Sequence, residues 1–151
     1  MEYIWIPEQT VPLNQSAIFE SSIPCRNGSV IHSDGSGVFI LRGIVNNPYA
    51  PFARYRVTFN GNIAIPTGGT VGPIAVALTE NGEPRQESLA ISTPTVVNSF
   101  GNVTSVATIT VPRGLGYSIS LRAVAPPADL TDTPAAAVVI RNANIVIERI
   151  A

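Results

Sequence analysis

The stretch ARYRVTFNGNIAI, residues 53–65, carries the clearest strand pattern in the chain. Its apolar residues Tyr55, Val57 and Phe59 alternate with arginine and threonine, and successive side chains of a strand point to opposite faces. The alternation therefore predicts a strand with one face in a hydrophobic core. The dipeptide Asn60-Gly61 predicts a turn that ends this strand, because both residue types accept positive φ.

The rest of the chain repeats this pattern in short runs. Thirteen prolines and twelve glycines leave no window long enough for an ordinary amphipathic helix. Runs rich in valine, isoleucine, threonine and aromatic residues lie between them, and Asn81-Gly82 predicts a hairpin turn. We expect about eight to ten strands, drawn from residues 3–6, 16–20, 29–32, 38–40, 54–59, 62–65, 74–79, 88–92, 105–111, 117–124, 137–140 and 144–150.

The domain organisation is simple. A chain of 151 residues fits one domain, and no repeat or linker divides residues 1–151. Residues 1–13 are expected to form an N-terminal arm or a first strand. The segment APPADLTDTPAA, residues 125–136, lacks periodicity and is rich in proline, which predicts an exposed loop between the last strands.

The surface is expected to be poor in charge. Only 13% of the residues are charged, against about 25% in an ordinary domain. All nine basic residues are arginine, which suits a surface that is buried in contacts, although compositional drift would explain it equally well. The net charge of −1 argues against nucleic-acid binding. The N-terminus resembles neither a signal peptide nor a membrane span, so we expect a protein made in a host cytoplasm, with no membrane partner.

Catalytic chemistry has little support. His32, Ser33 and Asp34 are the residue types of a catalytic triad, but neighbours on a strand point to opposite faces and cannot form the relay. Cys25 is the only cysteine, which excludes an intramolecular disulfide and predicts a buried, inert thiol. We predict a protein that is not an enzyme and has no cofactor, no metal site and no catalytic residue.

Two alternatives for binding stay open. The acids Glu80, Glu83 and Glu87 surround the Asn81-Gly82 turn, where a solvated hairpin tip is favoured over a weak surface calcium site. Tyr3 and Trp5 would stack on a sugar in a lectin, although such aromatic residues more often anchor a strand.

Three stretches resemble the tumour necrosis factor and complement globular-head superfamily. Residues 53–65 look like its aromatic central strand, residues 103–124 like a strand, turn and strand hairpin, and residues 143–151 like its last strand. The chain also resembles small proteins of this class from bacteriophages and spore-forming bacteria, through VPRG, YSISL and NANIVIERI. The receptor-binding signatures of animal cytokines are not recognisable, which argues against cytokine-like signalling.

The resemblance implies a ten-stranded jelly-roll β-sandwich that assembles as a homotrimer. The trimer interface or axis is expected to include Tyr55, Val57, Phe59, Tyr117, Ile119 and Ile147. The apolar arm would either pack along its own trimer or dock onto a partner; we predict docking through Tyr3, Ile4, Trp5 and Ile6, with the loop 125–136 facing outward.

The function that fits these features best is a bacteriophage capsid decoration protein on the virion surface, bound to the major capsid or another virion protein. A bacterial or spore surface adhesion module is one alternative. A glycan-binding fibre tip, using residues 125–136, is another.

Overall fold

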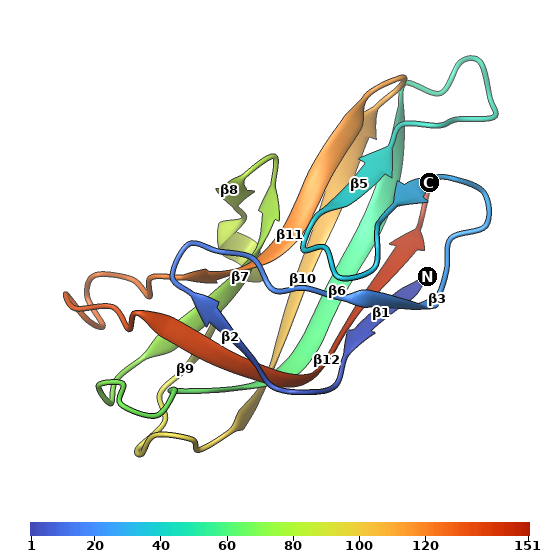
Figure 1. Cartoon of the computed structure of the whole chain (residues 1–151). Helices are drawn as coiled ribbons and strands as arrows, with labels where there is room; N and C mark the ends of the chain where they lie inside the picture. Colours follow the sequence, from blue (N-terminus) through green and yellow to red (C-terminus); the bar gives the residue numbers. More distant parts are fainter.

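Two six-stranded antiparallel sheets pack face to face in the computed structural model, which describes all residues 1–151 (Figure 1). We name them sheet A and sheet B. Sheet A has the order β10, β6, β12, β1, β3, and β2 also pairs with β12. Its strands are β10 (Gly101–Pro112), β6 (Phe52–Ala64), β12 (Ala137–Arg149), β1 (Glu2–Trp5), β3 (Glu20–Ile23) and β2 (Gln9–Pro12).

Sheet B has the order β4, β5, β11, β7, β8, and β9 also pairs with β7. Its strands are β4 (Val30–Ile31), β5 (Phe39–Arg42), β11 (Gly116–Val124), β7 (Ile74–Glu80), β8 (Glu83–Pro84) and β9 (Ala90–Ser92). The one helical element is a single 3₁₀ turn, η1 (Gln86–Ser88), and no helix is long and apolar enough to cross a bilayer. The predicted all-β jelly-roll sandwich is confirmed.

Strand β6 lies at the centre of the core. Tyr55, Val57 and Phe59 are fully buried, as their alternation predicted. β6 pairs with β10 along twelve residues, from Phe52 to Ile63, and with β12 on its other edge. The inward side chains of β6 are therefore positioned by a strand that is hydrogen-bonded along both edges.

Tyr55 also joins the two sheets. Its ring is buried in the core, and its hydroxyl donates a hydrogen bond of 2.6 Å to the backbone carbonyl of Arg42, at the end of β5 in sheet B. A buried phenol without a partner would be costly, so this bond allows a polar group at the centre of the sandwich. It sets the spacing of β6 against β5.

The predicted turn at Asn60-Gly61 is wrong, because β6 continues through both residues to Ala64. Gly61 does not need a left-handed backbone here. It lies on the inward face, where an added Cβ would sit 2.8 Å from Cζ of Phe59 and 3.1 Å from Cβ of Ala143. The glycine makes room for the Phe59 ring instead of reversing the chain.

Several strand boundaries differ from the prediction. Residues 62–65 continue β6, and residues 137–140 and 144–150 form one strand, β12, with a bulge where Asn142 takes φ 48°. In the predicted strand 16–20, Ser16 and Phe19 form isolated bridges and residue 20 begins β3. Strands β2 and β8 were not predicted, because each contains a proline, which only the end or edge of a strand tolerates.

The predicted hairpin over residues 103–124 is also wrong. β10 belongs to sheet A and β11 to sheet B, so the turn around Gly114 carries the chain from one sheet to the other. The Asn81-Gly82 turn is confirmed, with φ of 52° and 87°, and joins β7 to β8. The predicted return strand 88–92 shortens to β9, after η1.

Replacing Gly61 with alanine tests the continuous β6. Because the new methyl would collide with a buried ring that has no free space, we expect a loss of about 1–3 kcal/mol of unfolding free energy. Gly72→Ala is the matched control, since nothing lies within 4 Å of the added Cβ. Urea denaturation measures both, and equal stability of the two variants would contradict the packing described.

Candidate functional site

The outer face of sheet A is a surface that the chain does not cover with its own segments. Its three longest strands, β6, β10 and β12, lie side by side (Figure 1). The β10 residues of this face are exposed, and those of β6 and β12 are partly exposed. We define the sheet A face as Thr58, Asn60, Asn62, Thr104, Val106, Thr108, Asn144 and Val146.

The middle row of the sheet A face is uncharged and runs from Val106 through Thr58 to Val146, which are direct partners across the three strands. The next row is charged, because Thr108 pairs with Arg56, which pairs with Glu148 of β12. Some polar members bond within the sheet: Asn102 donates to Asn62 and Thr104 donates to Asn60, both at 3.1 Å. A polar side chain that already has a hydrogen-bond partner in the protein costs less free energy when water is removed from it. These parts of the face are therefore easier to bury than an ordinary polar surface.

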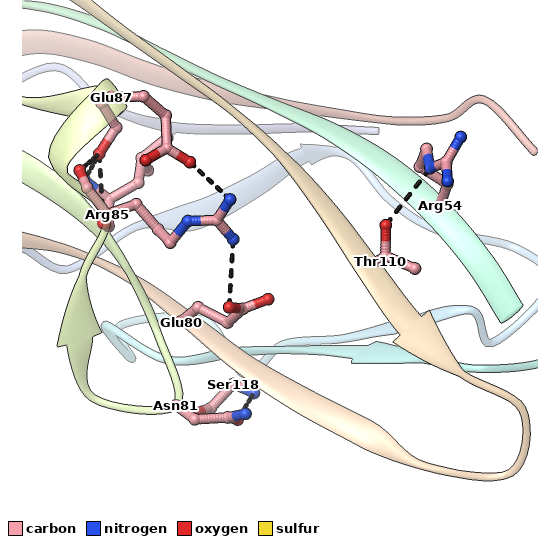
Figure 2. A network of polar contacts seen from close by, with 9 residues as sticks. Arg54, Glu80, Asn81, Arg85, Glu87, Thr110 and Ser118 are labelled. Carbon is pink, nitrogen blue, oxygen red and sulfur yellow. Dashed lines mark hydrogen bonds and ion pairs between the residues drawn. The ribbon is translucent and has the colours of Figure 1, made fainter.

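Charges stand at the rim of the face. Arg54 donates to Thr110 at 3.3 Å near one end of β6 (Figure 2), and Arg141 lies 3.7 Å from Glu8 near the other end. Glu2 of β1 accepts hydrogen bonds from Ser22 and Asn144, which lower the pKa of its carboxyl. An apolar or neutral centre with a charged rim is the usual layout of a protein interface.

The outer face of sheet B is different, because the chain covers it with its own segments. Ala75, Ala77 and Val124 are buried there, and Leu89 packs against them. A pocket of about 290 Å³ remains between the segment around η1 and the start of the loop after β11. Ala77, Leu89 and Val124 give it an apolar lining, while Asn14, Arg85 and Gln86 are its polar members.

Arg85 is neutralised by two carboxylates (Figure 2). Its guanidinium lies 3.1 Å from Glu80 and 2.5 Å from Glu87. The pKa of Glu87 is lowered, first by a hydrogen bond from its own backbone and then by Arg85. Glu80 and Glu87 are therefore bound to an arginine at the turn, and no cluster of three acidic side chains forms where the calcium alternative would need one.

The expected axis residues lie mostly inside the single chain. Tyr55, Val57, Phe59, Ile119 and Ile147 belong to its hydrophobic core and have at most 1% of their surface exposed. They have no surface to offer a second chain, because alternation directs them between the two sheets. Tyr117 packs partly buried against the same core. The residues available for an interface are their outward neighbours.

The N-terminal arm is a first strand and not a free segment. β1 pairs with β12 on one side and with β3 on the other, and β2 pairs with β12. Tyr3 is buried, Ile4 and Trp5 are partly buried, and only Ile6, with 52% exposed, remains at the surface. The ring of Tyr3 belongs to the core of the single chain, and docking through Ile4, Trp5 and Ile6 stays a prediction.

His32 is occupied in packing. Its ring stacks on Phe39 with centroids 4.2 Å apart, meets Tyr3 edge-on at 4.9 Å, and places Nε2 2.9 Å from the carbonyl of Ser36. Burial in this cluster raises the pKa of Tyr3 to about 12. Asp34 accepts a hydrogen bond from the backbone of Ser21 instead of meeting His32.

Cys25 is partly buried, where a fully buried thiol was predicted. Its Sγ accepts a hydrogen bond from the backbone of Val30 at 3.4 Å and lies 3.4 Å from Oγ of Ser29. Burial alone would raise the pKa of the thiol, but the hydrogen bonds from Ser29 and Val30 outweigh it, so the pKa lies below its usual value.

Most of the loop at residues 125–136 is exposed as predicted, while Pro126 is buried and Thr131 and Ala135 are partly buried. Neither the sheet A face nor the pocket was predicted from the sequence. The available signal for the face was the polar side of each alternating strand, such as Thr104, Val106 and Thr108. The pocket is formed by segments that meet only in the folded chain, so no local sequence pattern predicts it.

No family model and no curated protein matches the chain. Among solved structures, the globular domain of zebrafish complement 1qA protein aligns with a TM-score of 0.58 at 11% identity, over 96% of this chain and 93% of that one. The EclA C-terminal domain, a sugar-binding protein, covers 85% of this chain and 89% of its own at 12% identity, with a TM-score of 0.36, too low to support an inference. The first likeness establishes the complement-head jelly-roll fold.

Truncating Tyr3 tests the placement of β1. Tyr3→Ala removes a buried ring that packs edge-on against both His32 and Phe39, so we expect a loss of about 3–5 kcal/mol of unfolding free energy. The control Ile6→Ala alters an exposed side chain and should change stability by less than about 0.5 kcal/mol. Thermal and urea denaturation measure both, and a Tyr3→Ala protein as stable as the control would contradict a buried β1.

Proposed function

We propose that the protein is a non-enzymatic binding and assembly module that forms a homotrimer through the sheet A face. The observation that carries this proposal is the contrast between the two outer faces. Sheet B is covered by the chain's own segments, whereas the neutral centre of sheet A, with Val106 44% exposed, is not. A partner that buries Val106, Thr58 and Val146 would gain apolar contact at an uncharged row, with the opposite charges of Arg56 and Glu148 in the row beside it.

A second copy of the chain is the occupant that we propose for this face. Closed symmetric assembly gives each copy the same contacts, and most soluble oligomers are built in this way. The resemblance to the complement-head superfamily implies three copies. The absence of lysine and the low charge of the surface suit the same interpretation, because charges are depleted at the centre of interfaces.

The finer proposal is that the trimer decorates the surface of a bacteriophage capsid, bound to the major capsid protein or another virion protein. It rests on the likeness of residues 111–114, 117–121 and 142–150 to small phage proteins of this class. The genes beside this one test it directly: we expect capsid and portal genes. Spore-coat or adhesin genes instead would favour the surface adhesion module and overturn the virion proposal.

The glycan-binding alternative has its own test. A capsid-decorating trimer has no need of saturable sugar binding, so we expect a glycan array to be negative. Saturable binding of one glycan that is lost on shortening the loop 125–136 would favour a fibre tip instead.

The trimer is tested by light scattering at micromolar concentration. We expect three times the 15.9 kDa mass of one chain. The double variant Val106→Arg/Val146→Arg places two charges on the centre of the sheet A face and should yield monomers. Val96→Arg, at an exposed position outside the strands, should leave the mass unchanged.

Circular dichroism verifies that each variant keeps its β-sheet spectrum. Thr58→Arg, in the same row, provides a second variant should the double variant fail to fold. A monomeric wild-type protein would refute the proposed assembly. A folded double variant that remains trimeric would place the interface elsewhere.

A further inference from the structure

A second, smaller hollow of about 130 Å³ lies on the outer face of sheet B. Ser118, Ser120 and Arg122 are alternate residues of β11 and point outward, because Ile119 and Leu121 between them point into the core. Thr79 is the direct partner of Ser120 on β7, and Ser16 bridges to Arg122 from the other side. We call this hollow the hydroxyl cleft and define it by Ser16, Thr79, Gly82, Ser118, Ser120 and Arg122.

The Asn81-Gly82 turn is held against β11 and fixes the wall of the cleft. The backbone N–H of Asn81 donates to the carbonyl of Ser118 at 2.8 Å, and the Ser118 N–H donates to the Asn81 side chain at 3.0 Å (Figure 2). Gly82 follows with φ 87°, and its carbonyl accepts a hydrogen bond of 2.8 Å from Nη1 of Arg122. The Asn81-Gly82 turn thus holds Nη1 of Arg122, and two hydrogen bonds to Ser118 hold the turn against β11.

The cleft contains donors that the chain leaves without an acceptor. Nε of Arg122 is buried and has no hydrogen-bond partner. The Thr79 and Ser120 hydroxyls lie 2.5 Å apart and bond to each other, and the Thr79 hydroxyl also lies 3.5 Å from the Ser120 carbonyl. The hydroxyls of Ser16 and Ser118 form no hydrogen bond within the chain and can donate as well. A ligand rich in acceptors would satisfy all these groups at once.

The charge of the cleft is positive and uncompensated. Arg122 is the one charged residue among those lining it. The nearby Glu80 is bound to Arg85, 3.1 Å away. Arg122 therefore differs from Arg85, whose charge two carboxylates balance, and a hydrogen bond from a guanidinium to an anion is about twice as strong as one between neutral groups.

The donors of the cleft narrow the choice of ligand. The hollow of about 130 Å³ has room for a small tetrahedral group, and the guanidinium and hydroxyls at its wall suit the oxygens of such a group. We propose that the hydroxyl cleft binds a tetrahedral oxyanion, a phosphate or sulfate group, through Arg122 and the surrounding hydroxyls. This site lies on the sheet opposite the proposed trimer interface and goes beyond the assembly role.

An NMR titration of the ¹⁵N-labelled protein tests the proposal. Sodium phosphate and sodium sulfate are added in separate arms at constant ionic strength, balanced with sodium chloride. We expect saturable shifts of the Arg122 Nε–H signal and of the Ser118 and Ser120 amides. Glucose 6-phosphate, glucose 6-sulfate and unmodified glucose form further arms, which distinguish the two anions when they are carried on a larger molecule.

Two variants separate the cleft from general attraction of anions. Arg122→Gln should weaken binding at least about tenfold, which corresponds to about 1.4 kcal/mol. Arg56→Gln removes the same charge from an exposed position on sheet A and should leave the affinity unchanged. Ser118→Ala removes one donor without touching the charge and should weaken binding by a smaller factor.

Three results would overturn the proposal. The first is the absence of a saturable shift with either anion. The second is an equal loss of affinity in Arg56→Gln and Arg122→Gln, which would mean attraction to net charge alone. The third is binding of unmodified glucose as tightly as of its phosphate and sulfate esters. Should Arg122→Gln fail to fold, Ser118→Ala and the anion arms alone decide the question.

Discussion

Strand β6 hydrogen-bonds to β10 along one edge and to β12 along the other, and most of the molecule follows from this double pairing. Because β6 is fixed on both sides, its alternating residues must divide cleanly between a core face and a solvent face. Tyr55 on the core face then reaches across to the end of β5 and sets the distance between the sheets. Gly61 lets the strand run on beneath the Phe59 ring.

The two outer faces of the sandwich differ in how far the chain's own segments cover them. Segments of the chain itself cover the outer face of sheet B. Leu89, next to η1, packs against Ala75 and Ala77, and the Asn81-Gly82 turn is hydrogen-bonded to β11. The cover is incomplete, and the hollows left under it are lined by specific polar groups. Sheet A has no such cover, and its neutral centre suits a broad, flat contact with another chain. The proposed oxyanion site and the proposed assembly face therefore lie on opposite sheets.

The sequence was sufficient for the fold class because alternation and breakers act locally. The alternation at Tyr55, Val57 and Phe59 identified the core face, and Asn81-Gly82 identified a true turn. Asn60-Gly61 has the same turn chemistry, but pairing on both edges of β6 outweighs it, and that pairing involves residues far away in the chain. For the same reason the sequence alone could not separate core residues from axis residues: alternation shows that a side chain is buried, but not whether its own chain or another one buries it.

Measuring how far solvent reaches the Val106 methyl groups tests the central claim, that the sheet A face is covered in solution. A soluble paramagnetic agent attenuates methyl signals in proportion to their exposure. In one isolated chain Val106 is 44% exposed and Val96 is 57% exposed, so their signals would fall to a similar degree. We predict that Val106 and Val146 are strongly protected while Val96 is not. Equal attenuation of Val106 and Val96 would contradict the account.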